Sequence, residues 1–246
     1  MRLFDVSARP TILAALAAGA ALISSPAAAG TFQVSPINIT VPADRPVGSL
    51  TVKNGAAEPV SIRVYTYKWT QENGKDVYTE TRDLIASPPI FTIPAGGSQL
   101  IRVGMPKAAT DGEAAYRVIV EEIPRAAAAG EGIRVALRLN LPFYKQPKAK
   151  SAPNVQWTAL RSKDGTLELQ GNNRGGLHDQ INRIDIAGAS GARKTIVDQP
   201  GVVLPGRNRL WKALADASVR SGTPLKLILV KPGGEQVAEA VVQDRP

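Results

Sequence analysis

His178 is the only histidine of the chain, and it is the first residue to consider for acid–base or metal chemistry. A Ser–His–Asp hydrolase needs its nucleophile on a sharp turn, and no motif of that kind precedes His178. Metal sites built on histidine pairs need at least two of them, and one histidine beside scattered carboxylates is weak support for a metal. We therefore expect His178 to be a structural or solvated residue.

Glu121 and Glu122 come nearest to a catalytic carboxylate pair. Adjacent residues on a strand point to opposite faces, so these two cannot share a proton. The chain has no cysteine, which excludes thiolate metal sites and cysteine nucleophiles. The glycines lie in turns between strands and in no loop that leads into a helix, so no phosphate-binding loop is expected. The sequence predicts no enzyme site, no cofactor and no small-molecule substrate.

The first 29 residues have the features of a signal peptide. Arg2 and Arg9 form a basic segment, residues 11–23 are apolar, and three alanines at 27–29 form a small-residue cleavage site before Gly30. We expect export and a mature chain that begins at Gly30. The formal net charge is +9, with basic residues spread along the chain. For an exported protein this charge favours acidic proteins or envelope surfaces as partners over nucleic acid.

Short runs rich in Val, Ile, Thr and Tyr alternate with Gly, Pro, Asn and Asp after the leader, which is typical of strands and turns. No run outside the leader has the apolar period of a helix. Asn73-Gly74 predicts a tight hairpin. The expected strands cover residues 32–41, 48–54, 60–69, 89–93, 99–103, 116–123, 132–145, 155–160, 167–171, 181–186, 202–204, 225–230 and 237–242.

Seven of these strands fall within about 115 residues, a density typical of an immunoglobulin-like sandwich. Residues 145–153 are basic, contain two prolines and show no apolar alternation, so we interpret them as a linker. The expected fold is all-β. It has two immunoglobulin-like sandwich domains, residues 30–147 and 148–246, after the signal peptide at 1–29. Trp69, Trp157 and Trp211 are expected to fill a core or the domain interface.

One expected strand has two interpretations. Ile133, Val135, Leu137, Leu139 and Leu141 alternate with residues that are polar or small, which puts five aliphatic side chains on one face. Such a row can pack the core of its own sandwich. At a sheet edge it can instead be offered to an incomplete partner fold, while its backbone pairs with that partner.

Several segments, taken in chain order, resemble the PapD-like periplasmic pilus chaperones. Residues 111–124 (DGEAAYRVIVEEIP) are similar to the strand-F signature of that family. Residues 84–96 and 99–103 are similar to the two segments that precede it, and residues 202–207 are similar to a segment of the second domain. The strand at 133–141 lies where the family has its strand G.

The resemblance implies two sandwich domains set as a boomerang and a periplasmic location. It also implies donor-strand complementation, in which strand G fills the open groove of a pilus or fimbrial subunit until the subunit reaches an outer-membrane usher. We therefore expect Ile133, Val135, Leu137 and Leu139 to form an exposed apolar row, and Ala136 to pack inward. The alternative is an exported structural or adhesive protein of a surface fibre. A pilin would carry its donor segment directly after the leader, so the mid-chain position favours the chaperone.

The chain also departs from the family pattern. Asn38 and Pro142 stand where the family has a basic pair that holds the carboxylate of the subunit, and neither is charged. In this it resembles the divergent archaic, Csu-type branch. Arg117 and Arg138 are the residues that we expect to anchor the subunit in the cleft between the domains. The resemblance further implies that Arg102 and Glu113 form a structural ion pair.

Overall fold

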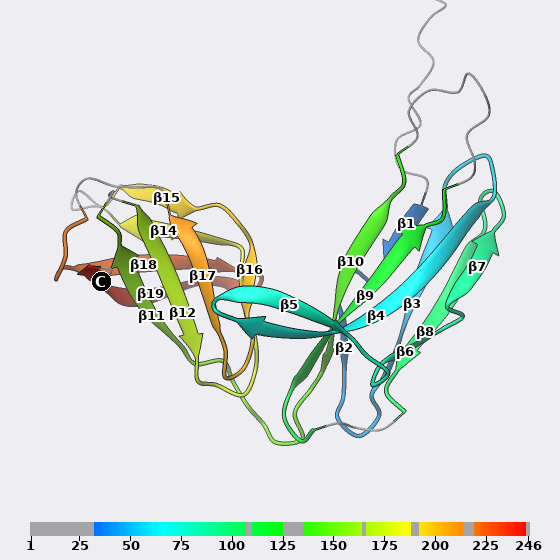
Figure 1. Cartoon of the computed structure of the whole chain (residues 1–246), viewed down its shortest axis with the longest axis horizontal. Helices are drawn as coiled ribbons and strands as arrows, with labels where there is room; N and C mark the ends of the chain where they lie inside the picture. The colour runs from blue at the N-terminus through cyan, green and yellow to red at the C-terminus, as the bar shows by residue number, and fades with distance from the viewer. Residues whose placement is uncertain are drawn as a thin grey trace, which may run out of the picture.

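The chain folds into two β-sandwich domains that meet at an angle, as the computed structural model shows (Figure 1). The structure describes residues 32–106, 110–124, 135–163, 166–187, 192–213 and 219–244. No helix occurs among these residues, and hence none that is long and apolar enough to cross a membrane. The expected signal peptide lies outside them.

Among the described residues, the first domain contains ten strands and the second contains nine. Those of the first domain are β1 (Phe32–Ser35), β2 (Ile39–Val41), β3 (Val47–Asn54), β4 (Val60–Glu72), β5 (Lys75–Glu80), β6 (Ile85–Ser87), β7 (Ile90–Ile93), β8 (Ser98–Gly104), β9 (Ala114–Glu122) and β10 (Arg138–Lys145). Those of the second domain are β11 (Val155–Arg161), β12 (Leu167–Asn173), β13 (Asp179–Ile181), β14 (Arg183–Ala187), β15 (Arg193–Val197), β16 (Gly201–Val203), β17 (Asn208–Ala213), β18 (Pro224–Lys231) and β19 (Gly234–Asp244).

Two sheets form the first domain. One has the order β1-β3-β8-β6, and the other has the order β2-β10-β9-β4-β5 with β7 paired to the first part of β4. The N-terminal run of the domain contributes to both sheets, because β1 pairs with β3 and β2 then pairs with β10 on the opposite side of the sandwich. Most ladders are antiparallel, but the β2–β10 pair is parallel.

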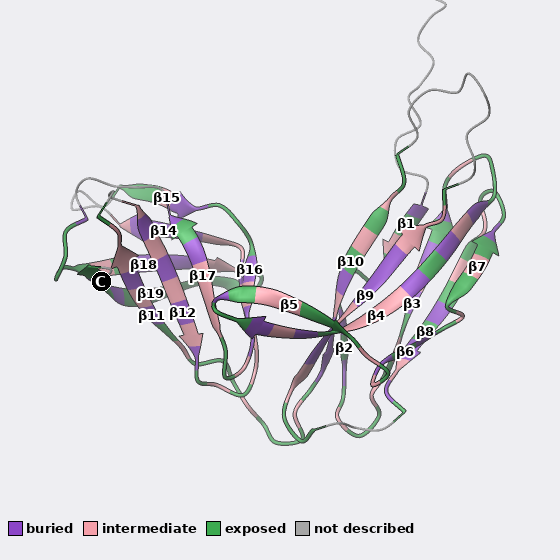
Figure 2. Cartoon of the chain, in the orientation of Figure 1, coloured by how far each residue is buried: buried purple, intermediate pink, exposed green. Residues whose placement is uncertain are grey.

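The core of the first domain follows from the period of two along its strands. In β4 the even-numbered Val60, Ile62 and Val64 are buried and pack in the cluster that also contains Val118 and Val120 of β9. The buried segments of β4 and β9 are purple in Figure 2. The apolar alternation read from the sequence therefore faces the opposing sheet.

The second domain is a seven-stranded sheet, β15-β14-β18-β19-β11-β12-β17, covered by the two-stranded pair β13–β16. Its separate core contains Trp157 and Trp211, whose rings stack with centroids 5.4 Å apart. The expectation that these tryptophans fill a core or the domain interface is therefore confirmed for this pair.

A buried asparagine fixes the same kind of corner in each domain. The Asn54 side chain is fully buried, and its Nδ2 donates to the carbonyls of Glu58, Ile93 and Pro94 at 2.7, 3.1 and 3.1 Å. In the second domain, Asn173 Nδ2 donates to the carbonyls of Leu177 and Val203 at 2.7 and 3.0 Å. Both side chains therefore satisfy loop carbonyls that lie away from water.

The β4–β5 hairpin extends from the first domain across to the second (Figure 1). Its turn is Asn73-Gly74, with φ values of 51° and 76°, as a tight hairpin turn requires. Toward the end of β4 the buried residues change from even to odd numbers, because Trp69 and Gln71 are covered by the second domain and not by the core of the first. One face of β4 therefore packs in the core of the first domain, and toward the end of the strand the other face contacts the second domain.

Candidate functional site

The outer edge of β10 is open over most of its length. On one side β10 pairs with β9 along all eight of its residues. On the other side β2 pairs only with Phe143, Tyr144 and Lys145. Residues 138–142 therefore have no strand partner on this side, among the residues that the structure describes, and the backbone groups that point outward from alternate residues are unpaired there. An edge of this kind is a template for a further strand.

The aliphatic row beside this edge is exposed at one end and buried at the other. Val135 is 84% exposed, Leu137 and Leu139 are partly buried against the core, and Leu141 is 5% exposed. Val135 is therefore exposed as expected for a donor residue, whereas Leu137 and Leu139 are partly covered. Leu141, the fifth residue of the expected donor row, is buried and not available to a subunit, because this face passes over the domain's own core. Ile133 lies outside the described residues. The strand itself begins at Arg138, later than the sequence predicted.

Ala136 also differs from its expectation, since it is exposed and does not pack inward. The odd-numbered residues face the core along this segment, so an even-numbered residue points away from it. The sequence predicted that one face of the strand serves the partner and the other packs on the chaperone. In the structure one apolar face does both, because its Leu141 end packs on the core and its Val135 end is exposed to solvent.

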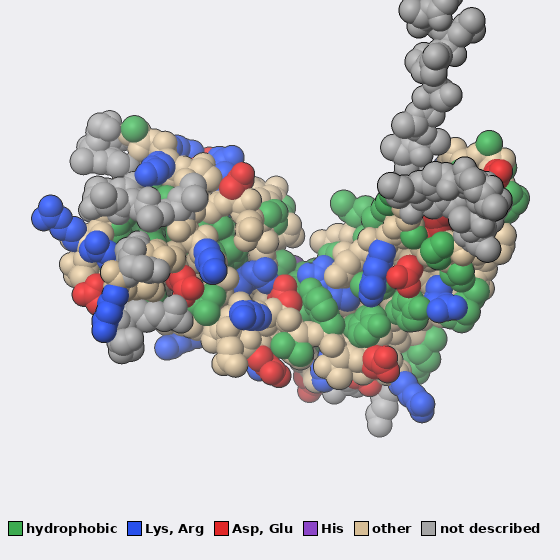
Figure 3. Space-filling model, turned by 45° about the horizontal axis from the view of Figure 1, so that its top comes forward, with side chains coloured by type: hydrophobic (Ala, Val, Ile, Leu, Met, Phe, Trp, Pro, Cys, Tyr) green, Lys and Arg blue, Asp and Glu red, His purple; other side chains and the backbone are tan. Residues whose placement is uncertain are grey.

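Arg117 lies on the opposite face of the same sheet, which is turned toward the second domain. It is paired in register with Pro142 of β10 and Tyr67 of β4. Trp69 and Tyr144 lie two residues further along those strands, on the same face, and contact Leu204 of the second domain. Figure 3 shows the hollow between the two domains, with Lys and Arg side chains (blue) close to where they meet.

The guanidinium of Arg117 has aromatic neighbours but no charged partner. Its carbon Cζ lies 3.7 Å from the ring centroid of Trp69 and 5.8 Å from that of Tyr78. It forms no ion pair or hydrogen bond with any residue in the described ranges, and its Nε is buried without a partner. A guanidinium held in this way has donors left for a ligand.

Arg138 and Arg117 are not brought together. Arg138 is on the same face of the sheet, four residues before Pro142, which is about 13 Å along a strand. Its Nη1 lies 3.8 Å from Oε1 of Glu121, its cross-strand partner. The two uncharged positions, Asn38 and Pro142, contribute no charge to either arginine, but Pro142 lies directly opposite Arg117.

The predicted ion pair between Arg102 and Glu113 is wrong. Arg102 is exposed on β8, in the other sheet of the first domain. Glu113, whose side chain is only 1% exposed, binds His178 instead: it accepts from the backbone nitrogen at 2.9 Å and faces Nδ1 at 2.8 Å. His178 is therefore a structural residue of the domain interface, and no spacing in the sequence links it to the distant Glu113.

Tyr144 belongs to the same contact between the domains, and we call the contact of Glu113, His178 and Tyr144 the joint. Its ring is stacked on His178, and burial raises the pKa of its hydroxyl above the usual value. On the other side of the joint, the Gln71 side chain donates to the carbonyl of Val202 at 2.7 Å and accepts from the nitrogen of Leu204 at 3.0 Å. Hydrogen bonds at the His178 contact and along the β4–β5 hairpin thus hold the angle between the domains.

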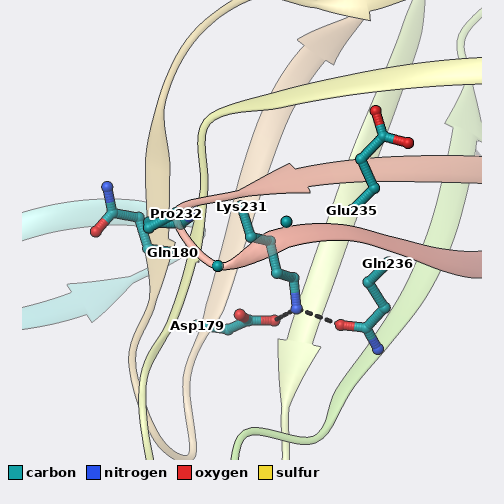
Figure 4. Close-up of a pocket in the computed structure, with 8 residues that line it drawn as sticks. Asp179, Gln180, Lys231, Pro232, Glu235 and Gln236 are labelled. Carbon is teal, nitrogen blue, oxygen red and sulfur yellow. Dashed lines mark hydrogen bonds and ion pairs between the residues drawn. The ribbon is translucent and has the colours of Figure 1, made fainter.

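A second hollow lies in the second domain, away from the open edge. Lys231 Nζ bonds Asp179 Oδ2 at 2.6 Å and also reaches Gln236, as Figure 4 shows. These charges neutralise one another, so the hollow offers less to a charged ligand than Arg117 does. Within the described ranges no three His, Asp or Glu side chains come together in a way that would hold a metal ion.

Comparison with known proteins gives the family. The sequence model described as pili and flagellar-assembly chaperone, PapD N-terminal domain, matches residues 31–150. No curated protein matches the chain.

Solved structures give the same two-domain fold. The chain is similar to a chain of the CsuC–CsuE chaperone–tip adhesion subunit complex from archaic Csu pili of Acinetobacter baumannii, with 22% identity, a TM-score of 0.66 and coverage of 88% of this chain and 100% of that one. It is also similar to the YadV chaperone (17%, TM-score 0.62, 85% and 100% covered). A chain of the SafA pilin–SafB chaperone complex of Salmonella enterica is similar too (14%, TM-score 0.60, 85% and 95% covered).

The residues matched by the family model include all of the first domain, with the open edge of β10 and Arg117. The fold of both domains agrees with that match. The first domain therefore belongs to the PapD N-terminal domain family of pili and flagellar-assembly chaperones, and the two-domain fold of the whole chain agrees with that assignment.

Proposed function

We propose that this protein is a periplasmic chaperone that holds pilus or fimbrial subunits by donor-strand complementation and delivers them to an outer-membrane usher. In this proposal residues 1–29 are removed on export, and residues 30–147 form the domain that binds the subunit. Similar folds occur in complexes with a tip adhesion subunit and with a pilin, and we propose the same class of partner here.

The observation that carries this proposal is the open edge of β10 beside an apolar row. A subunit that lacks a strand can pair with residues 138–142, while Val135, Leu137 and Leu139 fill its groove together with Ile133. Fully burying one such side chain contributes about 1.5–3 kcal/mol. Leu141 is already in the core of the chaperone, and its proposed part is to hold the donor strand in place.

Arg117 is the residue that we propose as the anchor for the end of the subunit. Because β2 occupies the edge from Phe143 onward, a strand that pairs along β10 in the direction of β2 has to end near Pro142. Arg117 lies opposite Pro142 with unpaired donors, so a terminal carboxylate can bind there through charge-assisted hydrogen bonds. Arg138 is proposed as a second contact further up the same face.

The donor strand is tested with Val135→Asp, in cells that also express the pilus subunits of the same genome. We expect the subunit that co-purifies with the wild type to be lost, because a charge would enter an apolar groove unpaired. Val47→Asp is the matched control, since Val47 is also exposed, at 53%, but lies on the other sheet. Wild-type recovery of the subunit with Val135→Asp would overturn the proposal.

The anchor is tested with Arg117→Ala. We expect lower recovery of the subunit and a thermal melt of the chaperone alone that stays cooperative and close to that of the wild type, because Arg117 loses only its stacking on Trp69 and no ion pair within the described residues. A collapsed melt would instead assign Arg117 to structure.

A further inference from the structure

Arg117 rests on an aromatic platform that limits how it can bind. One flat face of its guanidinium lies against the ring of Trp69, at 3.7 Å, and Tyr78 lies beside both. Stacking of this kind is attractive and keeps the guanidinium plane parallel to the ring. Only the edge of the group, with its N–H donors, remains available to a ligand.

The platform is itself held in place by a carboxylate. Trp69 Nε1 donates to Asp76 Oδ1 at 3.0 Å, and Gln71 Nε2 donates to the same oxygen at 2.9 Å. Since an indole has two side-chain torsions and one polar atom, this hydrogen bond fixes its orientation.

The second oxygen of Asp76 is held by the other domain. Arg209 of β17 donates from Nη1 to Asp76 Oδ2 at 2.7 Å, and both side chains are only 20% exposed. A continuous set of contacts therefore runs from Arg209 through Asp76 and Trp69 to Arg117. It joins the second domain to a guanidinium that forms no hydrogen bond or ion pair with the described residues of that domain.

We propose that Asp76 and Arg209 are positioning residues, through which the second domain orients Arg117 for the subunit without touching the subunit itself. The identity of the ligand rests on the proposed function, whereas the positioning of Arg117 does not. The competing explanation is that the Arg209–Asp76 pair only joins the domains.

The positioning is tested first without any ligand, by NMR of the arginine Nε–Hε signals. The signal of Arg117, assigned by its loss in Arg117→Lys, should be shifted upfield by the ring current of Trp69. In Arg209→Met and in Asp76→Asn we expect this signal to move back toward the other arginine signals. In Arg193→Met, which breaks an exposed ion pair with Glu235 of similar length, 2.8 Å, it should stay where it is.

The second measurement is a double-mutant cycle with the subunit that co-purifies with the wild type. Arg117→Ala should weaken binding about tenfold or more, the value of one charge-assisted hydrogen bond. Arg209→Met should weaken it by roughly two- to thirtyfold in the wild type, and should have no further effect when Arg117 is already alanine.

The outcomes separate the two proposals. An Arg117 signal that is unshifted in the wild type, or that does not move in a folded Arg209→Met or Asp76→Asn protein, overturns the positioning. Additive losses in the cycle overturn it as well, because they show that Arg209 acts independently of Arg117. If Arg117→Ala leaves subunit binding intact, the anchor of the proposed function is wrong, while the NMR result still decides the positioning.

Discussion

His178 of the second domain is stacked on Tyr144 of the first, with ring centroids 3.7 Å apart and planes within 6° of parallel. The same histidine is bound to Glu113 through its backbone nitrogen and its ring. The lone histidine of the chain, which first suggests chemistry, is thus part of the joint that sets the angle between the domains.

Replacing Glu113 by alanine should loosen this joint. Two N–H donors of His178 lose their acceptor, and each lost partner in a buried place costs about 1–3 kcal/mol. We expect a lower melting temperature and a larger radius of gyration by X-ray scattering. Glu113→Gln keeps an amide oxygen as an acceptor and should change both quantities less. Equal effects of the two variants would show that the hydrogen bonds do not hold the joint.

Asp76 should make the free energy of unfolding depend on pH in the acid range. Burial alone raises the pKa of its carboxyl, but hydrogen bonds from Arg209, Gln71 and Trp69 and the charge of Arg209 outweigh it and hold the pKa below the usual value. The carboxylate therefore stabilises the folded protein above the unfolded-state pKa of about 3.9, and this contribution is lost as the pH falls through the folded-state value.

The free energy of unfolding in urea should consequently fall more steeply below about pH 5 for the wild type than for Asp76→Asn, which has no proton to gain. If the free energy of unfolding of the two proteins changed in parallel with pH, Asp76 would contribute nothing to the loss of stability in acid.

Stability and subunit binding should separate along the donor strand. Leu141→Ala removes a core side chain that is 5% exposed, and should cost about 2–5 kcal/mol of unfolding free energy. Val135→Ala changes a side chain that is 84% exposed, and should cost less than about 0.5 kcal/mol. Chemical denaturation measures both. Similar losses at the two positions would contradict the burial seen along this segment.

Asn54 should contribute strongly to the free energy of unfolding although its side chain is polar. Asn54→Ala removes the hydrogen bonds that the amide donates to three carbonyls, of which that of Pro94 also accepts from the Gly97 nitrogen at 3.0 Å, so we expect a loss of about 2 kcal/mol in unfolding free energy. The control is Asn38→Ala, because Asn38 is exposed and in the same domain. A loss no larger than that of the control would mean that water replaces the amide at this corner.

Sequence periodicity was sufficient for the fold class, because strands buried on one face alternate with a period of two. The turn at Asn73-Gly74 was also predictable, since both residues adopt a positive φ that suits hairpin turns. The placement of Trp69 at the domain interface agrees with the expectation for a tryptophan of this chain.

Contacts between distant residues were not predictable in the same way. Glu113 meets His178 across 65 positions, and Asp76 meets Arg209 across 133, so no local pattern relates them. The burial of Leu141 depends on where the strand crosses its own core, and an apolar alternation has the same form whether a core or a partner covers it.

The hairpin between β4 and β5 belongs to the first domain by sequence and to the second by its contacts. The carbonyl of Gly74 accepts from the nitrogen of Leu210 at 3.1 Å, and a side chain at Gly74 would collide with Leu210. The two domains are consequently not exchangeable modules. A chimera that takes its second domain from a relative should receive the hairpin, residues 69–78, together with residues 201–210, as a single graft.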